Sequence, residues 1–160
     1  DASTVAIAAS VPVDLHAVDI EQAAVACARQ NLAAYAAQAY LGDLFEPLPA
    51  ELRGQIELVV ANAPYVPTEA IALMPSEARH HEPRIALDGG ADGVDVQRRI
   101  AAGAAEWLAP RGRLLIETSV EQSAATMDAF TAAGFTAEVR RDDERAGTAV
   151  VGRQAEPLPD

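Results

Sequence analysis

The segment Asn62-Ala63-Pro64-Tyr65 directly follows an apolar run at 56–61. An apolar run that ends in Asn-X-Pro-Tyr is typical of a buried parallel strand that opens into a loop at its carboxyl end. In open α/β sheets, ligands bind at that edge. Pro64 fixes its own φ and pushes Ala63 toward extended backbone, which holds the Ala63 carbonyl beside the Asn62 side chain. Two fixed acceptors and an aromatic ring predict a site that grips a planar amide or amine.

The rest of the chain alternates between strand-like and helix-like segments. Short apolar runs predict strands, and longer runs with apolar residues on one face predict helices. The expected strands are 13–19, 39–41, 56–61, 113–117, 135–140 and 148–152, and the expected helices are 21–37, 94–108 and 121–133. Helices between strands imply right-handed crossovers and an α/β fold with a doubly wound, mostly parallel sheet, closed by an antiparallel strand pair.

The connection at 64–93 is long for a segment without regular structure, and such loops are usually functional or disordered. It begins at the Asn-X-Pro-Tyr segment and contains Gly89, Gly90 and Gly93, which permit close backbone approach. We therefore expect an active-site loop.

Composition limits the partners. The chain has 160 residues and a net charge of −12. We expect one domain over 1–153 with a flexible tail at 154–160. A duplex-DNA binder normally needs a basic face, so the charge argues against nucleic acid and favours a protein partner with a basic surface. No stretch approaches the ~20 apolar residues of a membrane span. The single cysteine, Cys27, excludes an internal disulfide and indicates a reducing compartment, the cytoplasm; within its helical run we expect a buried thiol.

Asn62-Ala63-Pro64-Tyr65 resembles the Asn-Pro-Pro-Tyr motif of methyltransferases that use S-adenosylmethionine (SAM) to alkylate planar nitrogens. Residues 82–95 look like the segment that follows this motif in protein-(glutamine-N5) methyltransferases, the HemK-like family. The run 114–117, followed by Gln122, is similar to that family's next strand and helix. The resemblance extends from about residue 13 to residue 153.

The resemblance implies a Rossmann-like class I methyltransferase that methylates a glutamine of a peptide-chain release factor and so acts in translation termination. Asn62, Ala63, Pro64 and Tyr65 are the catalytic candidates. The Asn62 oxygen and the Ala63 carbonyl would accept both amide N–H bonds, which strengthen toward the transition state, and Tyr65 would pack on the amide plane. The family usually has proline where this chain has Ala63; the acceptor survives, and about 0.4–1 kcal/mol of rigidity is lost.

The cofactor candidates are Asp19, Ile20, Asp43, Leu44 and Asn62. By spacing alone, Asp19 either accepts ribose hydroxyls or caps the helix that starts near residue 21. The resemblance favours the ribose, and it assigns Asp43 to the adenine amino group.

The amino-terminal end departs from the family pattern, because no glycine occurs before Gly42 to form the expected Gly-rich SAM loop. The family's first strand and its amino-terminal helical domain have no counterpart either. A sheet without its middle strand leaves backbone groups unpaired, so we expect further residues upstream.

Several alternatives remain. An adenine-N6 DNA methyltransferase shares the Asn-X-Pro-Tyr logic and needs a flipped base. A non-catalytic relic that has lost SAM affinity is the other rival. His80 and His81 have no metal-ligand spacing, so no metal is expected. Glu82 and Arg84 are candidates for an ion pair that stabilises the loop, and Glu117 either supports the site or is simply solvated.

Overall fold

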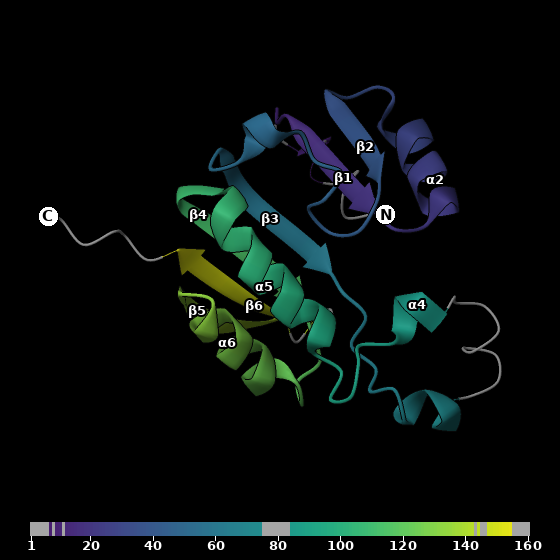
Figure 1. Cartoon of the computed structure of the whole chain (residues 1–160), viewed down its shortest axis with the longest axis vertical. Helices are drawn as coiled ribbons and strands as arrows, with labels where there is room; N and C mark the ends of the chain where they lie inside the picture. Colours follow the sequence, from purple (N-terminus) through teal and green to yellow (C-terminus); the bar gives the residue numbers. More distant parts are fainter. Residues whose placement is uncertain are drawn as a thin grey trace, which may run out of the picture. The chain divides into compact units, whose positions relative to one another are not determined.

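The structure is a computed structural model that describes residues 7, 9–10, 12–74, 84–142, 144 and 147–154. The chain divides into two compact units, Asp1–Leu52 and Arg53–Asp160. The strands and helices of both are drawn in Figure 1.

The first unit is a βαβ arrangement. Strand β1 (Leu15–Asp19) leads into helix α2 (Gln22–Leu32), which returns the chain to β2 (Ala37–Leu41). The two strands pair in parallel, from Leu15 opposite Ala37 to Asp19 opposite Leu41. Their carboxyl ends therefore meet at one edge, where the amide of Gly42 donates to the carbonyl of Asp19 at 3.1 Å. A short 3₁₀ helix, η1 (Ala50–Leu52), ends this unit.

Two details of this unit differ from the sequence prediction. Helix α2 ends at Leu32 and not at residue 37. The alanine-rich sequence carries no stop signal, and the pairing of β2 with β1 overrides its helix propensity. Cys27 was expected to be buried, which is wrong: it lies on the exposed side of α2, where its sulfur is 3.5 Å from the side-chain nitrogen of Asn31.

The second unit is a four-stranded sheet in the order β3-β4-β6-β5. Strands β3 (Ile56–Asn62) and β4 (Leu108–Glu117) are parallel, whereas β6 (Gly147–Gln154) is antiparallel to both β4 and β5 (Phe135–Asp142). Helices α5 (Asp95–Trp107) and α6 (Ser123–Ala132) lie side by side along the sheet (Figure 1). The long connection after β3 contains η2 (Ala70–Leu73) and α4 (Arg84–Leu87).

The core of this unit lies between the sheet and the two helices. Leu114 and Ile116 of β4, Val150 of β6 and Phe130 of α6 are fully buried. Gly152 lets the ring of Phe130 approach β6, since a Cβ there would lie 2.5 Å from the ring. On the alternate positions of β3, Leu58 and Val60 are 49% and 43% exposed.

The predicted α/β class, with parallel strands and an antiparallel closing pair, is confirmed. The described strands form two sheets, however, and not one. Strand β4 starts at Leu108, five residues before the predicted start at 113. The residues between Leu108 and Arg113 form a bulge within the strand, in which Arg111 has a φ of 66°. Gly134, with a φ of 86°, follows the end of α6, a position that favours glycine. In the described part of the chain, no helix has the length and apolar character needed to cross a membrane.

Candidate active site

The Asn-X-Pro-Tyr segment lies at the carboxyl end of β3, as the sequence predicts. Asn62 is the last residue of the strand and is exposed, and it lies opposite Glu117, the last residue of β4. Ala63 is buried, whereas Tyr65 is 40% exposed. The buried alanine thus anchors a segment whose amide and ring are both available at the surface.

The connection after the motif folds back beside it. Val66 forms a parallel bridge with Asp88; its amide donates to Leu87 at 3.0 Å and its carbonyl accepts from Gly89 at 2.9 Å. The Thr68 hydroxyl donates to Oδ1 of Asp88 at 2.6 Å. The two ends of the predicted active-site loop are therefore joined directly beyond Tyr65.

The glycines of this connection permit the close approach expected of them. A Cβ on Gly89 would overlap the carbonyl of Gly93, and one on Gly90 would overlap the carboxylate of Asp95. Gly93 has a φ of +82°, and a Cβ there would overlap the amide nitrogen of Gln122 and the carbonyl oxygen of Tyr65. No side chain fits at these three positions without movement of the loop.

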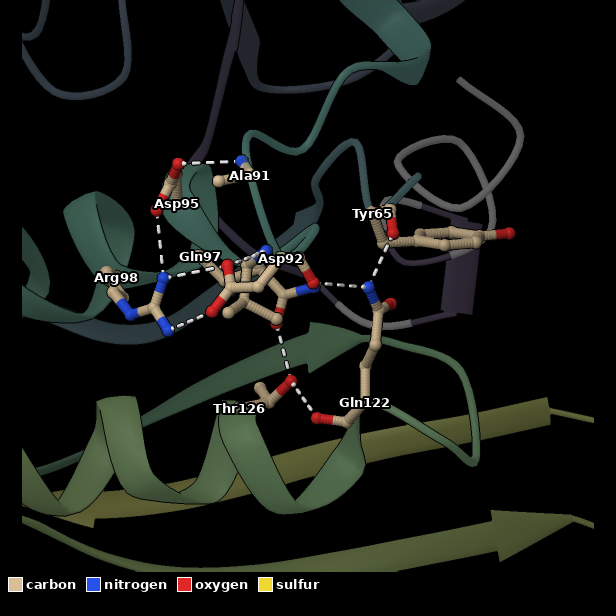
Figure 2. Close-up of polar contacts among 9 residues, drawn as sticks. Tyr65, Ala91, Asp92, Asp95, Gln97, Arg98, Gln122 and Thr126 are labelled. Atoms are coloured by element: carbon tan, nitrogen blue, oxygen red, sulfur yellow. Dashed lines mark hydrogen bonds and ion pairs between the residues drawn. The ribbon is translucent and has the colours of Figure 1, made fainter. Parts of the chain in front are cut away.

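Gln122 links the motif to the far end of the connection. Its amide nitrogen donates to the carbonyl of Tyr65 at 2.7 Å and to that of Asp92 at 3.2 Å (Figure 2). The ring of Tyr65 extends away from these contacts (Figure 2). From the sequence, Gln122 is a candidate only through the resemblance to the HemK-like family, and no local spacing relates it to Tyr65.

An ionic cluster fixes the connection to the start of α5. Arg98 binds both carboxylate oxygens of Asp92, at 2.9 and 2.5 Å, and one oxygen of Asp95 at 2.8 Å (Figure 2). The hydrogen bonds from Arg98, helped by the Val94 amide, lower the pKa of Asp92 from 3.8 to about 2. From the sequence alone, Arg98 is expected to be solvated surface; the structure shows that it pairs with Asp92 and Asp95.

The candidate cofactor residues of the first unit meet at its carboxyl edge. Asp19 ends β1 and is exposed, and the next residue, Ile20, is 48% exposed. Asp43 and Leu44 follow Gly42, whose amide binds the Asp19 carbonyl, and Leu44 has a φ of 48°. Oδ1 of Asp19 also accepts the amide of Glu21 at 2.9 Å in a turn that precedes α2. The N-cap position of α2 is Glu21, with no side-chain capping bond, so Asp19 is not the helix cap.

This edge suits an adenosine group. Two neighbouring carboxylates provide acceptors for hydroxyl and amino groups, and the exposed Ile20 provides an apolar surface. Asp19, at the end of β1, occupies the kind of position at which acidic residues bind ribose in dinucleotide folds. Among the residues that the structure describes, no group of three or more potential metal ligands occurs. His80, His81 and Glu82 lie outside the described residues, and so does the side chain of Arg84.

The chain has curated relatives named as glutamine methyltransferases. No protein-family model matches the chain. The release factor glutamine methyltransferase of Thermosynechococcus vestitus is 38% identical over 134 residues, which cover 80% of this chain and 46% of that protein. The ribosomal protein uL3 glutamine methyltransferase of Bordetella pertussis is 42% identical over 110 residues, which cover 66% of this chain and 36% of that protein.

The chain is a homologue of the glutamine methyltransferases. The resemblance seen in the sequence is thereby confirmed. The chain spans less than half the length of these relatives. The names of these relatives describe whole proteins, of which this chain matches a part.

Solved structures agree on the fold of this glutamine methyltransferase homologue. A ribosomal protein L11 methylase of Lactobacillus delbrueckii matches with a TM-score of 0.66 and 13% identity, covering 96% of this chain and 65% of that chain. A methyltransferase of Pyrococcus furiosus matches with a TM-score of 0.63 and 10% identity, covering 88% and 62%. The Rossmann-like class I methyltransferase fold is confirmed, and at these identities the likeness concerns the fold alone.

Proposed function

We propose that the protein transfers a methyl group from SAM to the side-chain amide nitrogen of a glutamine in a protein. The observation that carries this proposal is the Asn62-Ala63-Pro64-Tyr65 segment at the carboxyl end of β3, in a chain homologous to the glutamine methyltransferases. The catalytic candidates remain these four residues.

The chain's own contribution would be to orient the amide. A carboxamide nitrogen is a poor nucleophile because its lone pair is delocalised into the carbonyl. The Asn62 oxygen and the Ala63 carbonyl would accept the two N–H groups of the amide and so orient its nitrogen. These hydrogen bonds would strengthen toward the transition state, because the N–H protons become more acidic. Tyr65, which is 40% exposed, would pack on the amide plane. Asn62 and Tyr65 would act through position, and no separate general base is needed before attack.

The residues of the first unit that would hold SAM are Asp19, Ile20, Asp43 and Leu44. The family resemblance adds Asn62 to the cofactor candidates. Asp19 would accept the ribose hydroxyls, and Asp43 would accept the adenine amino group. When bound, SAM supplies an electrophilic methyl group on its sulfonium. The exposed carboxylate of Asp19 beside the exposed Ile20 supports this assignment.

For the substrate we propose a peptide-chain release factor, acted on in the cytoplasm as part of translation termination. The support is that relatives at 38% identity are named release factor glutamine methyltransferases. A relative named for ribosomal protein uL3 makes that protein the second candidate. The net charge of −12 favours a basic protein surface over nucleic acid in either case.

The test is an assay of methyl transfer from labelled SAM, with the full-length protein as the enzyme. The substrates are a release factor, ribosomal protein uL3, and duplex and single-stranded DNA. We expect label on a glutamine of the release factor and none on DNA. Label on uL3 alone would change the substrate, and label on DNA adenine alone would replace the proposal with the adenine-N6 reaction.

SAM binding separates an enzyme from a relic that has lost its cofactor. Calorimetric titration of SAM into the full-length protein should give saturable one-to-one binding. An absence of binding would favour the relic and remove the proposed activity.

A further inference from the structure

We propose that Gln122 is a positioning residue that holds the backbone of the Asn62–Tyr65 segment in its reactive shape. The proposal rests on the proposed methyl transfer for its catalytic consequence. Its structural half, that Gln122 holds Tyr65 in place, stands independently of that reaction.

The first step is the contact itself. The two hydrogens of the Gln122 amide go to two carbonyl oxygens, those of Tyr65 at 2.7 Å and Asp92 at 3.2 Å. These acceptors lie 57 and 30 residues away along the chain, so one side chain joins three separate segments. The amide has one orientation that suits them, because the reverse would place its oxygen against two carbonyl oxygens.

The second step is that Gln122 is itself held. The Ser119 hydroxyl lies 3.4 Å from the Gln122 side-chain oxygen and accepts the Gln122 backbone amide at 3.1 Å. The Gln122 carbonyl lies 3.0 Å from the hydroxyl of Thr126, which is fully buried and also bonds Gln97 at 2.6 Å (Figure 2). A glutamine anchored in this way loses little further freedom on binding Tyr65.

The third step concerns the motif. Its first residue, Asn62, is fixed by the pairing of β3 with β4, opposite Glu117. Its last residue, Tyr65, is fixed by Gln122, five residues beyond Glu117. Both ends of the motif are therefore tied to one short stretch of chain, and Pro64 restricts the backbone between them. The Gln122 bond supplies some of the rigidity that alanine at position 63 gives up.

The fourth step is that the surroundings leave room for this contact only. Gly93 lies against both the Gln122 amide and the Tyr65 carbonyl, and no side chain fits there. The bond from Gln122 to the Tyr65 carbonyl therefore depends on glycine at position 93. Because Tyr65 ends the proposed catalytic segment, this bond would set the positions of the Asn62 and Ala63 acceptors.

The test replaces Gln122→Met, which keeps the length of the side chain and removes its hydrogen bonds. The matched control is Gln154→Met, because the Gln154 amide also donates to a backbone carbonyl, that of Ala105 at 3.1 Å, at the other end of β6's pairing with β4. In the full-length protein we expect Gln122→Met to lower kcat by about 10-fold or more with an unchanged KM for SAM, as for a misplaced reacting group. Gln154→Met should leave both constants near those of the wild type.

A second measurement tests the Gln122–Tyr65 contact separately from the reaction. Hydrogen exchange at the amides of Val66, Thr68 and Gly89 should speed up in Gln122→Met and not in Gln154→Met. Unchanged exchange rates would show that Gln122 does not hold Tyr65. Faster exchange with an unchanged kcat would show that Gln122 does not position the catalytic segment. If the wild-type protein methylates no glutamine, the proposed function fails, and the exchange rates alone decide whether Gln122 holds Tyr65.

Discussion

Asn62 lies opposite Glu117 in the parallel register of β3 and β4, so the strand pairing itself places the first residue of the motif. Both residues end their strands at the same edge, and both are exposed. The pairing uses backbone groups only. A side-chain replacement at Asn62 should therefore disturb the chemistry and leave the strand in place.

Asn62→Ala should leave SAM binding nearly intact and lower the methylation rate by roughly 10²-fold or more, as for the loss of a preorganised polar contact. Calorimetry measures SAM binding, and steady-state rates with a glutamine-containing protein substrate measure the loss of activity. The control is Asn31→Ala, which removes an exposed asparagine of α2 that bonds only the sulfur of Cys27 in the described residues. Wild-type turnover in Asn62→Ala would refute the amide-gripping mechanism.

Asp19 has two candidate roles that a pair of substitutions separates. Asp19→Ala removes both the proposed ribose acceptor and the bond to the Glu21 amide. Asp19→Asn keeps an oxygen for the Glu21 amide, because asparagine forms the same turn as aspartate, but removes the charge. We expect SAM affinity to fall by about 1.5–3 kcal/mol in Asp19→Ala, the range for hydrogen bonds to a charged group.

Asp19→Asn should also lose affinity while its thermal unfolding stays near that of the wild type. Calorimetry with SAM and thermal melts of both variants provide the measurement. If Asp19→Asn binds SAM as the wild type does and only Asp19→Ala loses stability, then Asp19 serves only the turn before α2.

What the sequence could predict follows from how local each signal is. The strand end at Asn62 was predictable because the apolar run and Pro64 are adjacent. The close approach at Gly93 was predictable because only glycine suits such a position. The end of α2 at Leu32 was not, because an alanine tract carries no stop signal and the strand pairing decides it.

The contacts that hold the candidate site together depend on pairs that are distant in sequence. Gln122 meets Tyr65 across 57 residues, and Thr68 meets Asp88 across 20. The Arg98–Asp92 pair spans six positions, which is not a helix-face spacing, because Asp92 precedes α5. No periodicity reports such pairs, so only the folded chain reveals them.

The Asp92–Arg98 pair predicts a change in stability at acid pH. Arg98 lowers the pKa of Asp92 from 3.8 to about 2, so folding favours the ionised carboxylate. The stabilisation is complete above pH 3.8 and is lost as the pH falls through about 2. It should amount to less than about 1 kcal/mol, because the Asp92 side chain is 51% exposed and solvent screens the pair.

Urea unfolding of the wild type and Asp92→Asn between pH 5 and pH 2 measures this effect. The wild type's advantage in the free energy of unfolding should shrink as the pH falls toward 2, and added salt should reduce it at pH 5. An advantage that stays constant over this range would show that the ionised Asp92 does not contribute.

Gly93 and Gly134 have nearly the same backbone conformation, with φ values of +82° and +86°, but different surroundings. A Cβ on Gly134 would meet nothing within 4 Å, whereas one on Gly93 would overlap Gln122 and Tyr65. Alanine at either position carries the cost of a left-handed backbone, about 1–2 kcal/mol. Gly93→Ala should lose a further ~1–3 kcal/mol in urea unfolding, as for an overpacked site, and should also slow methylation because Tyr65 is displaced. Gly134→Ala should keep the wild-type rate. Equal losses of stability, with equal rates, would mean that the loop around Gly93 yields freely and does not hold the motif.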